Sequence, residues 1–274
     1  MVEKLFKLKE HQTGFRTEIL AGLTTFAAMS YILAVNPAIL SETGLGVAGL
    51  ITVTALAAAA GSLFMALLTN YPIALAPGMG LNAYFAYTVV ISNQVPVQAA
   101  LGFVFWNGLL FLVLSITGIR SRIAHAIPHS MRIGVQCGIG LFIAFIGLRN
   151  GGLIVNNEAT LVTIGDLSRP SVLLTLGGIL LMVFLVFKRV PGAIIVGILV
   201  LTALGLVLPK GNGTVTPLPE GFLALPAPID ETFFQLDIFY VFEHFNQAFP
   251  IILALLFVDL FDTIGTLIGV SRRA

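Results

Sequence analysis

Two aspartates stand inside an otherwise apolar run near the end of the sequence. Asp259 and Asp262 lie within residues 251–266 (IILALLFVDLFDTIGT), whereas the other acidic residues fall outside the apolar cores. Each carboxylate costs about 2.5–3.5 kcal/mol at the centre of a membrane helix, so the pair requires a structural or functional reason. A spacing of three places both on one helical face. Acids at such depth usually face a cavity and mark an ion or substrate path, and the alternative is a hydrogen bond between packed helices.

A proline- and glycine-rich motif, residues 76–85 (APGMGLNAYF), interrupts another apolar run. Pro77 lacks an amide proton, and the glycines after it permit backbone geometries that other residues resist. We therefore expect residues 70–76 to be extended and a half-helix to begin near Gly80, with Asn82 in its first turn. Irregular backbone survives at membrane depth only where it lines a cavity or is buried in protein, so Gly80 and Asn82 are candidates to bind a ligand.

Other polar residues in the apolar runs carry weaker signals. Serine and threonine in membrane helices often bond to carbonyls of their own helix. Thr25 in the first run and Thr263 beside the aspartates are candidates to line a site. The sequence leaves the roles of four further residues open: Asn36, Trp106, Asn107 and Gln136.

The composition excludes several classes of protein. The chain has 274 residues, of which 57% are hydrophobic and 10% are charged, against about 25% charged in soluble domains. The net charge of +1, without a basic stripe, excludes a nucleic-acid-binding protein. A single cysteine excludes a disulfide scaffold, and no cluster of Cys or His suggests a metal site. We expect no metal and no cofactor.

The apolar runs predict the elements that position these residues. A membrane helix needs about 20 mostly apolar residues, and the sequence predicts an all-α polytopic membrane protein in which the third span is broken. Eight spans are expected at residues 18–40, 47–68, 72–91, 97–119, 133–148, 172–187, 191–208 and 248–270.

Basic residues give an independent test of this count, because cytoplasmic loops are enriched in Lys and Arg. With the N-terminus in the cytoplasm, the cytoplasmic segments hold Lys4, Lys7, Lys9, Arg16, Arg120, Arg122, Arg132, Lys188, Arg189, Arg272 and Arg273. The outer loops hold Arg149, Arg169 and Lys210. The sequence thus predicts a multi-pass protein of the plasma or inner membrane with a cytoplasmic N-terminus.

Three motifs resemble those of AzgA-type purine permeases, the hypoxanthine–adenine–guanine branch of the nucleobase–cation symporters. The first is the opening span, residues 18–26 (EILAGLTTF) with 29–32 (MSYI) and 35–37 (VNP). The second is the third-span motif, residues 77–85 (PGMGLNAYF), and the third is the eighth-span motif, residues 257–266 (FVDLFDTIGT). The match runs in order from about Phe15 to the end of the chain.

This resemblance implies a proton-coupled importer of purine bases such as hypoxanthine, guanine and adenine. It implies an inverted repeat of seven plus seven spans, divided into a core and a gate that alternate access. The implied binding residues are Gly80 and Asn82 on the third span and Asp259 and Asp262 on the eighth, with proton coupling assigned to the two aspartates. The implied partners are the purine base, protons, the lipid bilayer and, by analogy with related folds, a second copy of the chain.

The sequence departs from the family pattern at its end, because it stops one span into the second repeat. We expect residues 1–125 to form core spans 1–4, residues 126–246 to form gate spans 5–7 with the outer loops, and residues 247–274 to form span 8. The family's tenth span, which supplies a binding glutamate, has no counterpart. The sequence is therefore interpreted as C-terminally truncated and as unable to transport alone.

Two alternatives remain open at this point. A related fold could carry another substrate, such as uracil, xanthine or a small anion. An intramembrane aspartyl protease would also place two acids in the membrane, but its carboxyls face each other from two helices, whereas Asp259 and Asp262 share one. The sequence therefore favours a transporter over an enzyme.

Overall fold

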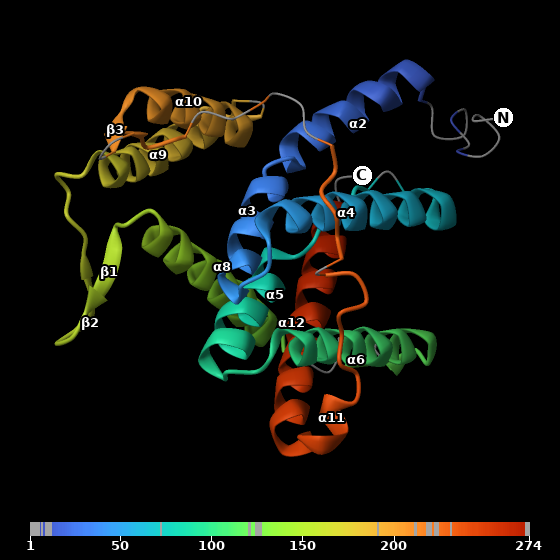
Figure 1. The fold of residues 1–274 in the computed structure, drawn as a ribbon. Coiled ribbons are helices and arrows are strands. Elements are labelled where there is room, and N and C mark those ends of the chain that lie inside the picture. Colours follow the sequence, from blue (N-terminus) through green and yellow to red (C-terminus); the bar gives the residue numbers. More distant parts are fainter. Residues whose placement is uncertain are drawn as a thin grey trace. The chain divides into compact units, whose positions relative to one another are not determined.

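The predicted spans are present as helices in the computed structural model (Figure 1). It describes residues 6, 8, 13–71, 73–119, 122–123, 128–190, 192–210, 213–217, 221, 225–230 and 232–271. Among these residues, six helices are long and apolar enough to cross a membrane: Phe15–Thr43, Val47–Thr69, Val97–Ile116, Ile133–Asn150, Pro170–Phe187 and Phe245–Thr263. Two shorter apolar helices are Met79–Ser92 and Ala193–Val207. These segments match the eight predicted spans, and the all-α prediction is confirmed.

The first half of the chain forms its helices close to the predicted limits. They are α2 (Phe15–Met29), α3 (Ile32–Leu40), the 3-10 helix η1 (Ser41–Thr43), α4 (Val47–Thr69), α5 (Met79–Ala83), the π-helix η2 (Tyr84–Ser92) and α6 (Val97–Ile116). The first span is divided at Ser30, whose hydroxyl donates to the Ala27 carbonyl at 3.0 Å.

As predicted, the third span is broken before α5, and Gly78 is extended there. The prediction that residues 70–76 are all extended is wrong, because Asn70 is left-handed (φ 54°) and the Ile73 amide donates to the Tyr71 carbonyl in a tight turn. The π-helical second part of the span was not anticipated.

The second half contains α8 (His129–Asn150), α9 (Pro170–Phe187), α10 (Ala193–Val207), α11 (Tyr240–Glu243) and α12 (Phe245–Ser271). Two short antiparallel hairpins lie in the loops, and the sequence did not indicate either. Strand β1 (Ile154–Asn157) pairs with β2 (Leu161–Ile164), and β3 (Pro209–Lys210) pairs with β4 (Gly213–Thr214). The first hairpin is closed by Asn157, whose side-chain oxygen accepts hydrogen bonds from the amides of Ala159 and Thr160.

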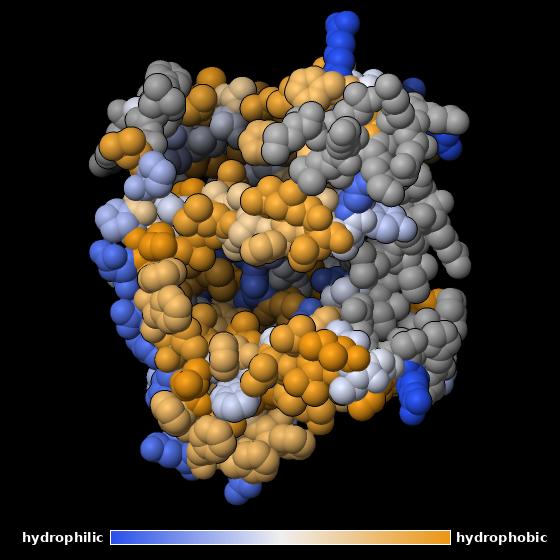
Figure 2. Space-filling view, turned by 90° about the vertical axis from the view of Figure 1, so that its right-hand side faces the viewer, coloured by the Kyte–Doolittle hydropathy of each residue, from blue (hydrophilic) through white to orange (hydrophobic). Residues whose placement is uncertain are grey.

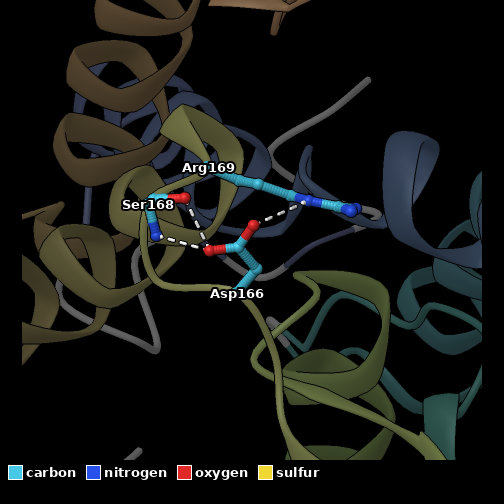
Figure 3. Close-up of polar contacts among 3 residues, drawn as sticks. All are labelled: Asp166, Ser168 and Arg169. Atoms are coloured by element: carbon cyan, nitrogen blue, oxygen red, sulfur yellow. Dashed lines mark hydrogen bonds and ion pairs between the residues drawn. The ribbon is translucent and has the colours of Figure 1, made fainter.

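A tight polar turn leads into α9 (Figure 3). One carboxylate oxygen of Asp166 accepts from the backbone amide of Ser168 at 3.0 Å and from its hydroxyl at 2.6 Å. The other oxygen lies 3.5 Å from Nε of Arg169, the residue directly before the helix. These hydrogen bonds lower the pKa of Asp166, with the Ser168 hydroxyl making the largest contribution.

Contacts between residues divide the chain into two compact units. The first comprises residues 1–33, 57–76 and 144–225, and the second comprises residues 34–56, 77–143 and 226–274. In the first unit, α9 and α10 lie side by side. Glycines permit this packing, because a methyl group on Gly178 would lie 2.7 Å from Leu201, and one on Gly197 would lie 2.4 Å from Met182.

The second unit is organised around the packing of α12 on α6. Its fully buried side chains include Phe103 on α6, Val89 on η2 and Leu255 and Leu260 on α12. The segment before α11 passes directly over α6, where the Asp237 amide donates to the Gln98 carbonyl at 2.8 Å. This core holds α5, α6 and α12 together and so positions the polar residues described below.

Large apolar side chains cover much of the surface visible in Figure 2. Phe187 and Leu68, for example, are 82% and 80% exposed. In water such exposure would be costly, whereas in a bilayer these side chains meet lipid of similar polarity. The surface is therefore that of a protein whose helices are embedded in a membrane.

Candidate functional site

The half-helix α5 begins inside the third apolar run. Gly78 caps it in an extended conformation (φ −76°, ψ 115°). In the first turn, the backbone amide of Asn82 donates to the Gly78 carbonyl at 3.1 Å. Gly78 also permits a close approach of α12, because a methyl group there would lie 3.2 Å from Oδ2 of Asp262. The break in the span thus brings the backbone of α5 beside one of the two predicted aspartates.

Asn82 is held by a chain of hydrogen bonds that runs through two other helices. Its amide nitrogen donates to the side-chain oxygen of Asn36 on α3. The amide nitrogen of Asn36 donates in turn to the hydroxyl of Thr54 on α4 at 2.9 Å. Asn36 and Thr54 are each only 2% exposed, so their hydrogen bond gives each buried polar side chain a partner in place of water.

Asp259 is held from its own helix and from α6. The Thr263 hydroxyl lies 3.3 Å from Oδ1 of Asp259 and donates to it. The amide nitrogen of Asn107 donates to Oδ2 at 3.4 Å. Asn107 is 5% exposed, and its own side-chain oxygen is buried without a hydrogen-bond partner in the part of the chain that the structure describes. Asp259 is half-buried, whereas Asp262 is exposed.

A cavity of about 370 Å³ lies between these groups within the second unit. Most of its wall is apolar, and its polar lining residues are Asn82, Asn107, Thr232 and Asp259. Small-molecule sites have volumes of roughly 300–1,000 Å³ with apolar walls and a few polar groups that fix orientation. The cavity therefore has the size and chemistry of a site for a small, partly polar molecule.

The predicted site residues take different positions around this cavity. Asn82 and Asp259 line it, and Thr263, which is not a lining residue, donates a hydrogen bond to Asp259. Gly80 packs against α8, where a methyl group on it would lie 2.6 Å from Cγ2 of Ile139. Neither Gly80 nor Asp262 is a lining residue.

Thr25 lies on α2, in the first unit. Its hydroxyl donates to the Ala21 carbonyl of the same helix at 2.9 Å. This is the local bond that threonines in membrane helices commonly make. The functional roles of all six predicted residues stay predictions.

Four polar residues at or behind the cavity were not assigned from the sequence. Asn36 and Asn107 were left open, and Thr54 and Thr232 were not singled out. The available signal was an amide or hydroxyl in an apolar run, but Trp106 gives a similar signal and instead donates to the Ile238 carbonyl at 2.9 Å. Only the contacts between helices distinguish a polar residue at the cavity from one that bonds elsewhere.

No group of His, Cys, Asp and Glu side chains among the described residues is arranged to hold a metal ion. The polar groups at the cavity are two amides, one hydroxyl and one carboxylate, which suit hydrogen bonding to an organic ligand. A bundle of apolar helices with a broken span and such a cavity defines the class: a polytopic membrane transporter.

Residues 16–274 match the model of the Permease family, and the chain belongs to this family. The family consists of permeases rather than enzymes, which confirms the prediction of a transporter and leaves the protease alternative without support. The resemblance to a purine permease is also borne out by the relatives described next.

The chain is 46% identical over 273 residues to "Putative permease MJ0326" of Methanocaldococcus jannaschii, covering 100% of the chain and 61% of the relative. It is 42% identical over 278 residues to "Guanine/hypoxanthine permease PbuO" of Bacillus subtilis, covering 98% and 62%. It is 42% identical over 277 residues to "Adenine permease AdeP" of Escherichia coli, covering 100% and 60%. The chain thus spans about three fifths of the length of these relatives.

Proposed function

We propose that this chain belongs to a secondary active transporter that imports purine nucleobases, namely hypoxanthine, guanine and adenine. The observation that carries the proposal is the cavity that Asn82 and Asp259 line, in a chain whose relatives include proteins named for guanine, hypoxanthine and adenine. Because the chain spans about three fifths of those relatives, the activity is proposed for the complete transporter.

The chemistry of the cavity suits a purine base. A purine has two apolar faces and a rim of N–H donors and nitrogen or oxygen acceptors. The apolar wall, which includes Leu81, Phe85 and Leu255, would cover the faces. Asp259 would accept an N–H of the base, and Asn82 would bond to another part of the rim.

The other candidate residues are given supporting roles. Gly80 would keep α5 close to its neighbours, and Thr25 and Thr263 would line the path, Thr263 by orienting Asp259. Asp259 would handle the base or the proton, and Asp262 would couple the two. A carboxylate in an apolar helix can take up a proton and release it as its surroundings change, which is the basis of the proposed proton symport.

The transport cycle proposed is alternating access, in which a core moves against a gate around the site. Residues 1–125 and 247–274 are assigned to the core, and residues 126–246 are assigned to the gate. The distribution of basic residues supports a cytoplasmic N-terminus. The plasma or inner membrane is the proposed location, and a homodimer is the proposed assembly.

An uptake panel tests the proposal. The complete transporter that contains this sequence is expressed in a host without purine transport and is given labelled hypoxanthine, guanine, adenine, xanthine and uracil, with and without a protonophore. We expect uptake of the first three bases, and we expect the protonophore to abolish their accumulation. Uptake of xanthine or uracil alone would replace the proposed substrate, and uptake that resists the protonophore would exclude proton symport.

A further inference from the structure

Asn82 is the polar residue of the broken span that lines the cavity. Two buried residues behind it engage its side-chain nitrogen and leave its side-chain oxygen for a ligand. The Asn82 amide nitrogen donates to Asn36, and Asn36 donates to Thr54 at 2.9 Å. Neither Asn36 nor Thr54 lines the cavity. The three residues come from three elements, α5, α3 and α4, and all three residues belong to the second unit.

The direction of this chain is given by the hydrogen bonds of the two asparagines. A side-chain amide donates only through its nitrogen and accepts only through its oxygen, whereas the Thr54 hydroxyl can do either. The nitrogen of Asn36 donates to Thr54, and the oxygen of Asn36 accepts from the nitrogen of Asn82. The oxygen of Asn82 is thus the atom left for another partner.

We propose that Asn36 and Thr54 are positioning residues that turn the carbonyl oxygen of Asn82 toward the base. This inference rests on the proposed function and deepens it. Asn82 then acts as an acceptor, and so does the carboxylate of Asp259 on α12. The site therefore selects a base that carries N–H groups on two separate parts of its rim, because a buried acceptor without a donor is costly.

A set of substitutions at Thr54 tests the inference in the complete transporter. Thr54→Val keeps the shape of the side chain but cannot accept the hydrogen bond from Asn36, whereas Thr54→Ser keeps the hydroxyl. Thr54→Ala removes the hydroxyl without adding a methyl group in its place. The matched control is Thr117→Val, because the Thr117 hydroxyl is exposed and, among the described residues, bonds only to carbonyls at the end of the preceding helix, α6.

The measurement is the initial rate of labelled hypoxanthine uptake as a function of concentration, normalised to the amount of transporter in the membrane. For Thr54→Val and Thr54→Ala we expect KM to rise about threefold to tenfold, the loss expected for one hydrogen bond, with the maximal rate retained. Thr54→Ser and Thr117→Val should match the wild type. A merely structural role would lower the amount of protein and leave KM unchanged.

Each other outcome overturns the inference. A wild-type KM in Thr54→Val would show that the orientation of Asn82 does not depend on Thr54. Equal impairment of Thr54→Ser and Thr54→Val would assign the effect to packing, and loss of both Thr54→Val and Thr54→Ala from the membrane would assign Thr54 to folding. If the wild type itself takes up no purine base, the proposed function fails, which is distinct from failure of the Thr54 variants alone.

Discussion

Asn107 on α6 donates a hydrogen bond to Asp259 on α12, with 3.4 Å between the amide nitrogen and Oδ2. The two residues are 152 positions apart in the sequence, and α6 and α12 pack against each other along the core of the second unit. The other polar atom of Asn107, its oxygen, is buried without a hydrogen-bond partner among the described residues. Asn107 therefore supports a carboxylate at the cavity while carrying an unsatisfied group of its own.

This arrangement predicts that Asn107→Leu impairs function without lowering stability. The substitution removes a donor to a carboxylate, a hydrogen bond worth about 1.5–3 kcal/mol, so we expect the KM for hypoxanthine to rise roughly tenfold or more. It also removes a buried unpaired oxygen, which costs about 1–3 kcal/mol, so the melting temperature of the purified complete transporter should not fall. Uptake kinetics and thermal unfolding measured on the same variant check both statements.

Ser115→Ala is the matched control for Asn107→Leu. Ser115 lies on the same helix, and its hydroxyl is likewise buried without a partner among the described residues, but it does not line the cavity. We expect wild-type uptake from this variant. If Ser115→Ala were as impaired as Asn107→Leu, the loss of uptake could not be attributed to the hydrogen bond between Asn107 and Asp259.

Asp259→Asn is expected to abolish accumulation of purine bases while the protein remains in the membrane. The amide has nearly the shape of the carboxylate, but it carries no negative charge and cannot shuttle a proton. The control is Asp230→Asn, in an exposed turn of the loop before α11. Uptake and membrane content of both variants are compared, and wild-type uptake by Asp259→Asn at normal membrane content would contradict the role proposed for this residue.

Gly80→Ala tests the close contact between α5 and α8. The new methyl group would lie 2.6 Å from Cγ2 of Ile139, so one of the helices or the isoleucine must shift. Overpacking of this kind costs about 1–3 kcal/mol, and we expect a lower melting temperature of the complete transporter. The same substitution made in an Ile139→Ala background should lower the melting temperature less, because the atom that collides is then absent.

Gly138→Ala provides the comparison on α8 itself. A methyl group at Gly138 meets nothing within 4 Å, and alanine favours helix over glycine by about 1 kcal/mol. This variant should be as stable as the wild type or more stable. A melting temperature for Gly80→Ala equal to that of Gly138→Ala would show that α5 and α8 do not meet as described.

The spans were predictable from the sequence because their signal is local. An apolar run such as residues 97–119 specifies α6 (Val97–Ile116) within a few residues, since about 20 apolar residues have few alternatives to a membrane helix. The break before α5 was also local, because Pro77 and the glycines around it act on their own backbone. The π-helical geometry of η2 depends on packing and left no such pattern.

The partners within the site were not predictable, because they join distant parts of the chain. Asn36 and Thr54 are 18 residues apart, Asn82 and Asn36 are 46 apart, and Asn107 and Asp259 are 152 apart. A single amide in an apolar run is equally consistent with packing or with a site. The spacing of three in the aspartate motif predicted that both carboxylates lie on one helical face, but not which of them lines the cavity. Asp259 does, and Asp262 lies beside Gly78, which is itself a lining residue.

Protonation of Asp166 gives a prediction for the loop before α9 (Figure 3). The Ser168 hydroxyl and amide lower the pKa of Asp166 below its ordinary value of 3.8. A carboxyl whose pKa is lowered by folding stabilises the folded turn above the unfolded pKa, and that contribution is lost as the pH falls through the folded pKa. The turn should therefore be intact at neutral pH and should open only in strongly acidic solution.

Ser168→Ala should raise the pKa of Asp166 toward 3.8 without restoring it fully, because the amide of residue 168 and Arg169 still act on the carboxylate. Ser168→Thr keeps the hydroxyl and should titrate like the wild type. The measurement is the chemical shift of the Asp166 carboxyl carbon against pH, in purified protein in detergent micelles. Because Asp166 is ionised at neutral pH in every variant, uptake at pH 7 should be the same in all three proteins. An unchanged titration in Ser168→Ala would show that the hydroxyl does not hold the carboxylate, and a loss of uptake at pH 7 would give this turn a role beyond the start of α9.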